Sequence, residues 1–143
     1  MTLKQHLLAT GAVVAVMTPF AGIAELAIFS AGSILIDVDH YFFYVQRSGH
    51  CDVSGMFSYF RNIDRNLTKI PYLGICIFHT IEFLLLIALL SYSFPLLRFL
   101  LYGLSFHLLL DIVDLVRLKC PFIRAYSLTE HLVRRKTTGY PFF

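Results

Sequence analysis

Four apolar segments most constrain what this 143-residue chain can fold into: residues 7–18, 22–36, 70–94 and 95–116. The last two are each long enough to cross a bilayer, which takes about 20 helical residues. The first two are shorter and are separated by a turn-like stretch around Pro19. They predict either one long helix that is kinked at the proline or a tight helical hairpin.

The distribution of basic residues predicts the orientation in the membrane. If the first two segments form a hairpin, every lysine and arginine except Arg98 lies on one side. Such an excess is typical of the cytoplasmic side, and it places the loop at residues 41–69 and the tail at residues 117–143 there. If the first two segments formed a single long helix, only Lys4 would move to the other side of the membrane. Residues 1–24 also have the features of a cleavable signal peptide, which stays an alternative.

Composition indicates a single membrane-embedded domain over residues 1–143. Hydrophobic residues make up 57% of the chain and charged residues 15%, and the mean hydropathy is +0.71. This leaves too little polar surface for a soluble domain of this length. We expect an all-α, polytopic helix bundle of four spans with both termini in the cytoplasm. The net charge of +3 is spread over loop and tail, which argues against nucleic-acid binding.

Acidic residues and histidines interrupt the apolar segments at three places. They are Asp37, Asp39 and His40, then His79 and Glu82, then His107 and Asp111. Ionisable groups inside a bilayer are costly and are usually functional. Imidazole and carboxylate together are ligands for borderline divalent metals such as zinc and manganese. The sequence therefore predicts a site for one or two divalent ions. The three cysteines form no C-x-x-C pair, and we expect them to be reduced.

Helix geometry brings these groups to a similar depth. At 1.5 Å per residue, His79 and His107 each lie about 13–16 Å from the cytoplasmic ends of their segments, so they can face each other. Asp111 follows His107 by one turn and shares its face. If the helix continues past Asp37, Asp39 points about 200° away from it. Either the helix ends there, or one of these two aspartates orients a histidine without binding the metal.

Simpler roles stay open for several of these residues. Asp37 or Asp39 could cap a helix that begins near His40. His79 could be a core histidine bonded to a backbone carbonyl, and Glu82 could be a hydrogen-bond orienter only. Four further residues have no assigned role: Asp114, His6 at the start of the first segment, His50 in the loop, and His131 in the tail.

The order of these motifs resembles a known family, the YdjM-like, LexA-binding family of small bacterial inner-membrane proteins. The resemblance covers roughly residues 1–115 and is carried by an early histidine, an Asp-x-Asp-His motif, a later histidine and a His-x-x-x-Asp motif. It implies a metal-dependent hydrolase in the bacterial inner membrane. The matching positions are His6, then Asp37, Asp39 and His40, then His79, then His107 and Asp111.

We therefore expect a membrane-embedded hydrolase whose metal activates water at the cytoplasmic leaflet. Asp39 or Glu82 would act as the general base. The metal ligands would be Asp37, Asp39, His40, His79, His107 and Asp111. Basic residues of the loop suit a lipid phosphate or phospholipid as the substrate. A non-catalytic membrane adaptor for a cytoplasmic protein and a small metal or proton transporter are the alternatives.

Overall fold

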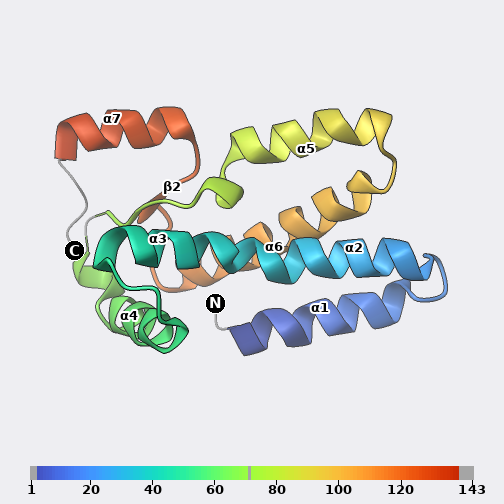
Figure 1. Cartoon of the computed structure of the whole chain (residues 1–143), viewed down its shortest axis with the longest axis horizontal. Helices are drawn as coiled ribbons and strands as arrows, with labels where there is room; N and C mark the ends of the chain where they lie inside the picture. The colour runs from blue at the N-terminus through green and yellow to red at the C-terminus, as the bar shows by residue number, and fades with distance from the viewer. Residues whose placement is uncertain (1–2, 71, 139–143) are drawn as a thin grey trace.

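Two helical hairpins form the apolar part of the molecule, and their turns lie at the same end (Figure 1). The computed structural model describes residues 3–70 and 72–138. In chain order these form α1 (Leu3–Met17), α2 (Ile23–Ile34), η1 (Leu35–Asp37), α3 (Val38–Ser48), α4 (Val53–Arg65), η2 (Leu67–Lys69), β1 (Gly74–Ile75), η3 (Ile77–His79), α5 (Ile81–Ser93), α6 (Leu97–Arg117), β2 (Arg124–Ala125) and α7 (Leu128–Thr138). The fold is therefore mostly helical, as the sequence predicts.

The first hairpin, α1 and α2, confirms the tight turn expected between the first two apolar segments. The amides of Phe20 and Ala21 donate to the Met17 carbonyl at 2.9 and 3.1 Å and close the turn. Helix α2 then begins after Gly22, whose amide donates to the Glu25 carboxylate at 2.7 Å. This hydrogen bond satisfies an amide that has no partner inside the helix.

Helix α2 does not end at the Asp37 motif but runs through the 3-10 turn η1 into α3. The joined helix covers Ile23–Ser48, which is 26 residues, and α6 has 21 residues. Among the described residues, these two helices are long and apolar enough to cross a membrane. Only 28% and 33% of their most apolar stretches are buried, so much of that apolar surface faces outward.

The helix in the third apolar segment is shorter than the segment itself. Helix α5 begins only at Ile81, because the Thr80 hydroxyl caps it by accepting from the Phe83 amide at 3.3 Å. The chain before it forms β1 and η3 instead of helix. With 13 and 15 residues, α5 and α1 are about 20 and 22 Å long, against a hydrocarbon core of about 30 Å. The helix lengths alone therefore support two spans and not four.

A short parallel pairing joins the loop before α5 to the C-terminal tail. Strands β1 and β2 pair Gly74 with Arg124 and Ile75 with Ala125. The all-α prediction missed this pair, because strands of two residues leave no alternating pattern in a sequence. The pairing holds Arg124 beside the C-terminal half of α6, where its guanidinium reaches Asp111.

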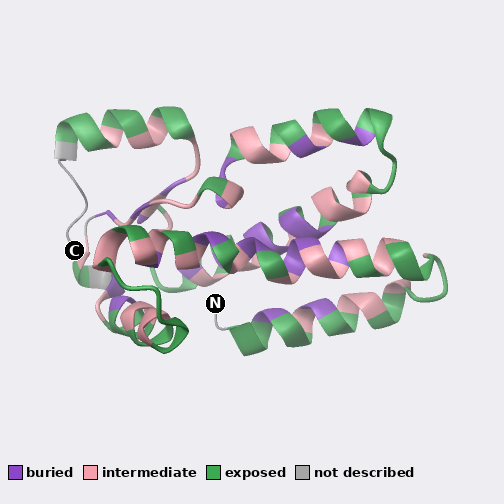
Figure 2. Ribbon diagram, viewed as in Figure 1, coloured by how far each residue is buried: buried purple, intermediate pink, exposed green. Residues whose placement is uncertain are grey.

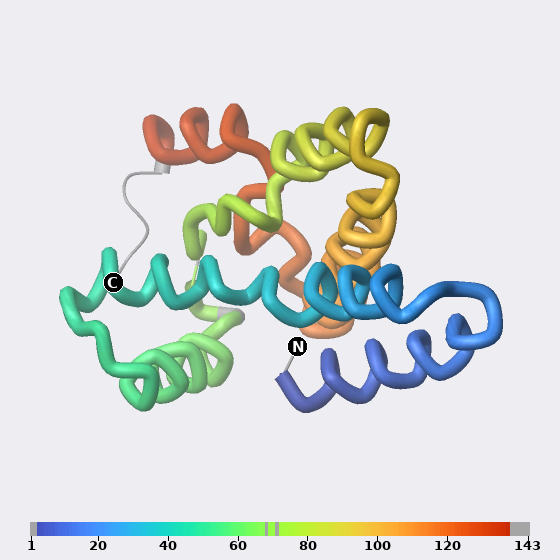
Figure 3. Tube along the Cα trace, turned by 45° about the vertical axis from the view of Figure 1, so that its right-hand side comes forward, coloured from blue at the N-terminus to red at the C-terminus, as the bar shows by residue number. Residues whose placement is uncertain are grey.

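Helices α2 and α6 make the most extensive helix contact, and two glycines allow it. A Cβ atom at Gly103 would collide with the Phe29 carbonyl oxygen and would lie 2.9 Å from the Ser33 amide nitrogen. A Cβ atom at Gly32 would lie 2.6 Å from the Leu100 carbonyl oxygen. Small residues let helix backbones approach closely in membrane bundles. Figure 2 shows buried residues gathered where these helices cross, and Figure 3 again shows both hairpin turns on one side.

The apolar core has two parts. One lies between η1, α5 and α6 and contains Ile36, Ile87, Leu104 and Leu108. The other joins α4 and the tail to the C-terminal half of α6 through Ile63, Leu67, Leu115 and Ile123. The second part fixes the polar end of the molecule to the hairpins.

Alanine substitutions at two helical glycines test the close contact of α2 with α6. Gly103→Ala should destabilise the protein by about 1–3 kcal/mol, because the added methyl group overpacks the contact. Gly11→Ala is the matched control on α1, where a Cβ atom would meet nothing within 4 Å. It should be neutral or slightly stabilising, since alanine favours a helix over glycine. Thermal unfolding in detergent, followed by circular dichroism, measures both; equal melting of the two variants would contradict the packing.

Candidate metal centre

Histidine and carboxylate side chains from several segments meet at the ends of the hairpins away from their turns. His6 lies near the start of α1, and the 3-10 turn η1 ends at Asp37. Asp39 and His40 follow in the first turn of α3. The 3-10 turn η3 ends at His79, directly before the Thr80 cap of α5, and α6 carries His107 and Asp111 one turn apart.

Four of these side chains, Asp37, His79, His107 and Asp111, form what we call the central cluster. The Oδ1 atom of Asp37 lies 3.6 Å from Nε2 of His79 and 3.3 Å from Nε2 of His107. The Oδ2 atom of Asp111 lies 3.9 and 3.8 Å from the same two nitrogens. Zinc bonds of about 2.0–2.2 Å put neighbouring ligand atoms of a tetrahedral site about 3.3–3.6 Å apart. One ligand atom each from Asp37, His79 and His107 lies within 4.8 Å of the other two, and Asp111 groups in the same way with His107 and His6. Asp37, His79 and His107 can therefore hold a divalent cation, with Asp111 beside it.

Both histidines of the central cluster are oriented by a hydrogen bond at Nδ1. The Nδ1–H group of His79 donates to Asp39 Oδ2 at 3.0 Å, and that of His107 donates to the Ser33 carbonyl oxygen at 2.7 Å. Each ring then presents the lone pair of Nε2 to the cluster, which is the arrangement typical of metal-bound histidine. Both Nε2 atoms are buried, and neither has a hydrogen-bond partner among the described residues. Burying a polar nitrogen without a hydrogen bond costs free energy, and a cation bound in the cluster would offset that cost.

His6, whose role the sequence left open, belongs to this site. Its ring stacks on that of His107, with centroids 3.9 Å apart and planes 7° apart. Its Nε2 atom lies 3.2 Å from Asp111 Oδ1. The Thr10 hydroxyl, one turn later on α1, shares a hydrogen bond with the Ser33 hydroxyl at 2.6 Å. This contact fixes α1 against α2 beside the cluster.

Arg124 is a site residue that sequence reasoning missed. Its Nη1 group donates to Asp111 Oδ2 at 3.2 Å, and only 14% of its side chain is exposed. A guanidinium has five N–H donors, so it can hold a carboxylate and a second anion together. In the sequence Arg124 is one more basic residue of the tail, and no local pattern distinguishes it.

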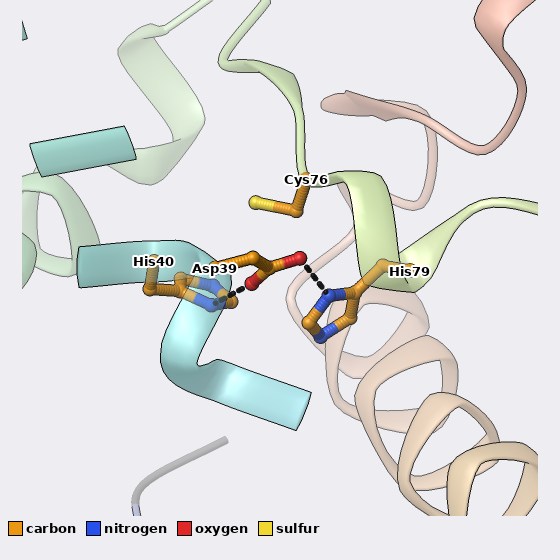
Figure 4. A group of neighbouring side chains, drawn as sticks. All are labelled: Asp39, His40, Cys76 and His79. Atoms are coloured by element: carbon orange, nitrogen blue, oxygen red, sulfur yellow. Dashed lines mark hydrogen bonds and ion pairs between the residues drawn. The ribbon is translucent and has the colours of Figure 1, made fainter. Parts of the chain in front are cut away.

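Asp39 lies between the central cluster and a second group of possible ligands, His40 and Cys76 (Figure 4). The Asp39 Oδ2 atom accepts from His79 Nδ1, while Asp37 faces the opposite edge of the same ring. The helix thus continues past Asp37, and Asp39 orients a histidine, which was one of the two alternatives. Burial raises the pKa of the Cys76 thiol, and the Asp39 carboxylate raises it further.

Other sequence candidates lie away from the cluster. The Glu82 carboxylate, expected beside His79, accepts from the Leu128 amide at 2.9 Å, at the start of α7. His50 is exposed in the loop, and His131 lies on α7. Asp114 is half-buried one turn beyond Asp111, and the groups of metal-ligating atoms found among the described residues do not include it.

Metal analysis tests the central cluster directly. Purified, detergent-solubilised protein should take up zinc or manganese, and the His107→Ala, Asp111→Ala double variant should lose one equivalent, because one ligand and the carboxylate beside it are gone. His50→Ala removes an exposed loop histidine and should retain the wild-type content. Inductively coupled plasma mass spectrometry after removal of free metal gives the stoichiometry. Wild-type protein that takes up no metal at micromolar concentration would contradict the site.

Comparisons with protein-family models, with curated proteins and with solved structures give no match to this chain. The resemblance to the YdjM-like family therefore rests on the motifs alone and stays a prediction. The geometry of the central cluster is then the basis for assigning a function.

Proposed function

We propose that this chain is an integral membrane hydrolase that uses a divalent cation, zinc or manganese, bound at the central cluster. The observation that carries the proposal is that two buried Nε2 atoms, from His79 and His107, make no hydrogen bond among the described residues and converge on carboxylates. Imidazole with carboxylate is the ligand chemistry of hydrolytic zinc sites. A purely structural cluster would instead give each of these buried atoms a hydrogen-bond partner.

The protein side chains supply position and charge around the cation. A divalent cation held there activates water and polarises a phosphoryl or acyl oxygen. Asp39 holds the ring of His79, while His6 and Arg124 hold the two carboxylate oxygens of Asp111. We assign Asp39 a positioning role ahead of the general-base role, since it is 6% exposed and its Oδ2 atom already accepts two hydrogen bonds.

Asp37 is where the central cluster opens to its surroundings. Its side chain is 32% exposed, whereas the side chains of His79, His107 and Asp111 are exposed by 7% or less. A substrate therefore reaches the cluster from the Asp37 side.

Charge and surroundings favour a lipid phosphate or phospholipid as the substrate. Arg124 brings a guanidinium next to the cluster, and this planar group binds phosphate through paired hydrogen bonds. Large apolar side chains are exposed on the helices around the site, among them Leu35, Ile77 and Leu109. An anionic amphiphile at the inner leaflet fits both features better than a soluble substrate does.

We infer that α1, α2, α5 and α6 cross the bacterial inner membrane, with the hairpin turns outside and the metal centre near the cytoplasmic surface. Both termini are then cytoplasmic. In this arrangement all lysines and arginines except Arg98 lie on the cytoplasmic side. Because α1 and α5 are short, the arrangement implies a bilayer that is thinned locally around the bundle.

Lipid turnover is the experiment that tests the proposed function. Metal-loaded protein in mixed micelles should release phosphate from phosphatidate or a headgroup from a phospholipid, and a chelator should abolish the release. Arg124→Gln should lower kcat/KM about 10²-fold with bound metal retained, because a phosphate-facing donor is lost. The matched control is Arg98→Gln, an exposed arginine at the start of α6 and far from the central cluster, which should equal wild type.

Two outcomes of this assay would overturn parts of the proposal. If metal-loaded protein turns over no lipid class, the hydrolase assignment gives way to a membrane adaptor. If the two arginine variants are equally active, Arg124 does not bind the substrate phosphate.

Cysteine labelling tests the membrane arrangement. Cys51 and Cys120 lie in the loop and the tail, so both should react with a membrane-impermeant maleimide only from the cytoplasmic side. The experiment compares spheroplasts with inverted vesicles in a Cys76→Ser background, which leaves these two thiols for labelling. Reaction of either cysteine in intact spheroplasts would contradict the arrangement.

A further inference from the structure

We infer that Asp39, His40 and Cys76 form a second cation site beside the central cluster, selective for zinc or a similar thiophilic divalent cation. We call it the thiolate site. Cys76 belongs to no motif that the sequence analysis singled out. The inference does not depend on hydrolysis at the central cluster, because it concerns different ligand atoms.

The ligand atoms of the thiolate site face one another. Asp39 Oδ1 and His40 Nδ1 are buried and lie 3.0 Å apart as an ion pair, and the same nitrogen lies 3.3 Å from Asp37 Oδ1. One ligand atom each from Asp39, His40, Cys76 and His79 lies within 4.8 Å of all the others. Figure 4 shows the Cys76 side chain projecting toward Asp39 from the chain that enters η3. A carboxylate, an imidazole and a thiol therefore converge on one point.

Backbone contacts on both sides of Cys76 fix its position. Before it, Gly74 and Ile75 pair with the tail in β1. After it, the amide of His79 donates to the Cys76 carbonyl at 3.1 Å and closes η3. His40 is held in turn by its ring contact with Phe60, with centroids 5.1 Å apart. The three ligands thus come from rigid segments, which favours a preformed site.

The chemistry of the three donors selects the cation. Sulfur, imidazole nitrogen and carboxylate oxygen together suit zinc and disfavour magnesium or calcium, which prefer oxygen alone. Binding displaces the thiol proton of Cys76 to solvent, because a coordinated thiol is deprotonated. Three protein ligands also leave a position for water or a substrate atom.

A cavity gives access to the thiolate site. It has a volume of about 150 Å³ and is lined by Asp39 and Cys76 together with apolar side chains that include Phe42, Phe43 and Phe78. Two of the three proposed ligands therefore border a space large enough to hold water molecules.

Asp39 couples the thiolate site to the central cluster. Its Oδ1 atom faces His40, and its Oδ2 atom accepts from His79 Nδ1. His79 in turn presents Nε2 to Asp37 in the central cluster. A cation on Asp39 draws electron density from this carboxylate, so occupancy of one site changes the affinity of the other.

Cobalt(II) is the probe, because a thiolate ligand gives it a charge-transfer absorption in the near ultraviolet that imidazole and carboxylate ligands do not. Full-length, metal-free, reduced protein in detergent is titrated with cobalt(II). Wild type should take up two equivalents and develop the thiolate band. Cys76→Ser should lose the band and one equivalent, while Cys120→Ser, a matched half-buried cysteine, should keep both. His107→Ala should lose the other equivalent and keep the band.

The wild-type spectrum decides the question even if a variant fails to fold. Folded wild-type protein without a thiolate band at saturating cobalt overturns the thiolate site, and so does a band that persists in folded Cys76→Ser. A normal band without lipid turnover ends the hydrolase proposal and supports the thiolate site. Lipid turnover without a thiolate band supports the hydrolase proposal and overturns the thiolate site.

Discussion

Burial of ionisable groups among apolar helices is the constraint on which the rest of this structure depends. His6, His79 and His107 are exposed by 1% or less, and Asp111 by 5%. Uncompensated charge or unmade hydrogen bonds in such a place cost several kcal/mol. The fold supplies a partner for one edge of each cluster histidine, Asp39 for His79 and a backbone carbonyl for His107. The other edges, the Nε2 atoms, face carboxylates, and a divalent cation bound between them would satisfy both kinds of atom.

Helix packing and metal binding are linked through the contact of α2 with α6. Gly32 allows the two backbones to approach, and Ser33, the next residue, places its carbonyl oxygen 2.7 Å from His107 Nδ1. Gly103 lies one turn before His107 and packs on the same part of α2. The contact that joins the two hairpins therefore also orients a candidate metal ligand, and a cation bound there would add to the stability of the bundle.

The sequence predicted those features that depend on local pattern. The hairpin and the helix of the fourth segment follow from hydrophobic length. His79 does meet His107, with ring centroids 5.3 Å apart, but from the 3-10 turn η3 and not from the helix that the depth argument assumed. The late start of α5 was not predicted, because the Thr80 cap interrupts a segment that is apolar throughout. Arg124 and Cys76 reach the site through a parallel pairing of two-residue strands, which connects distant parts of the chain and has no periodicity.

Anomalous X-ray scattering from crystals grown with zinc tests the central claim most directly, because it locates the ion. We expect a peak enclosed by Asp37, His79, His107 and Asp111, with bond lengths of about 2.0–2.2 Å to the two Nε2 atoms and to Asp37, which leaves one position for water. The ring of His79 should keep its hydrogen bond to Asp39. A fully occupied zinc ion elsewhere, with no peak between these four side chains, would contradict the account.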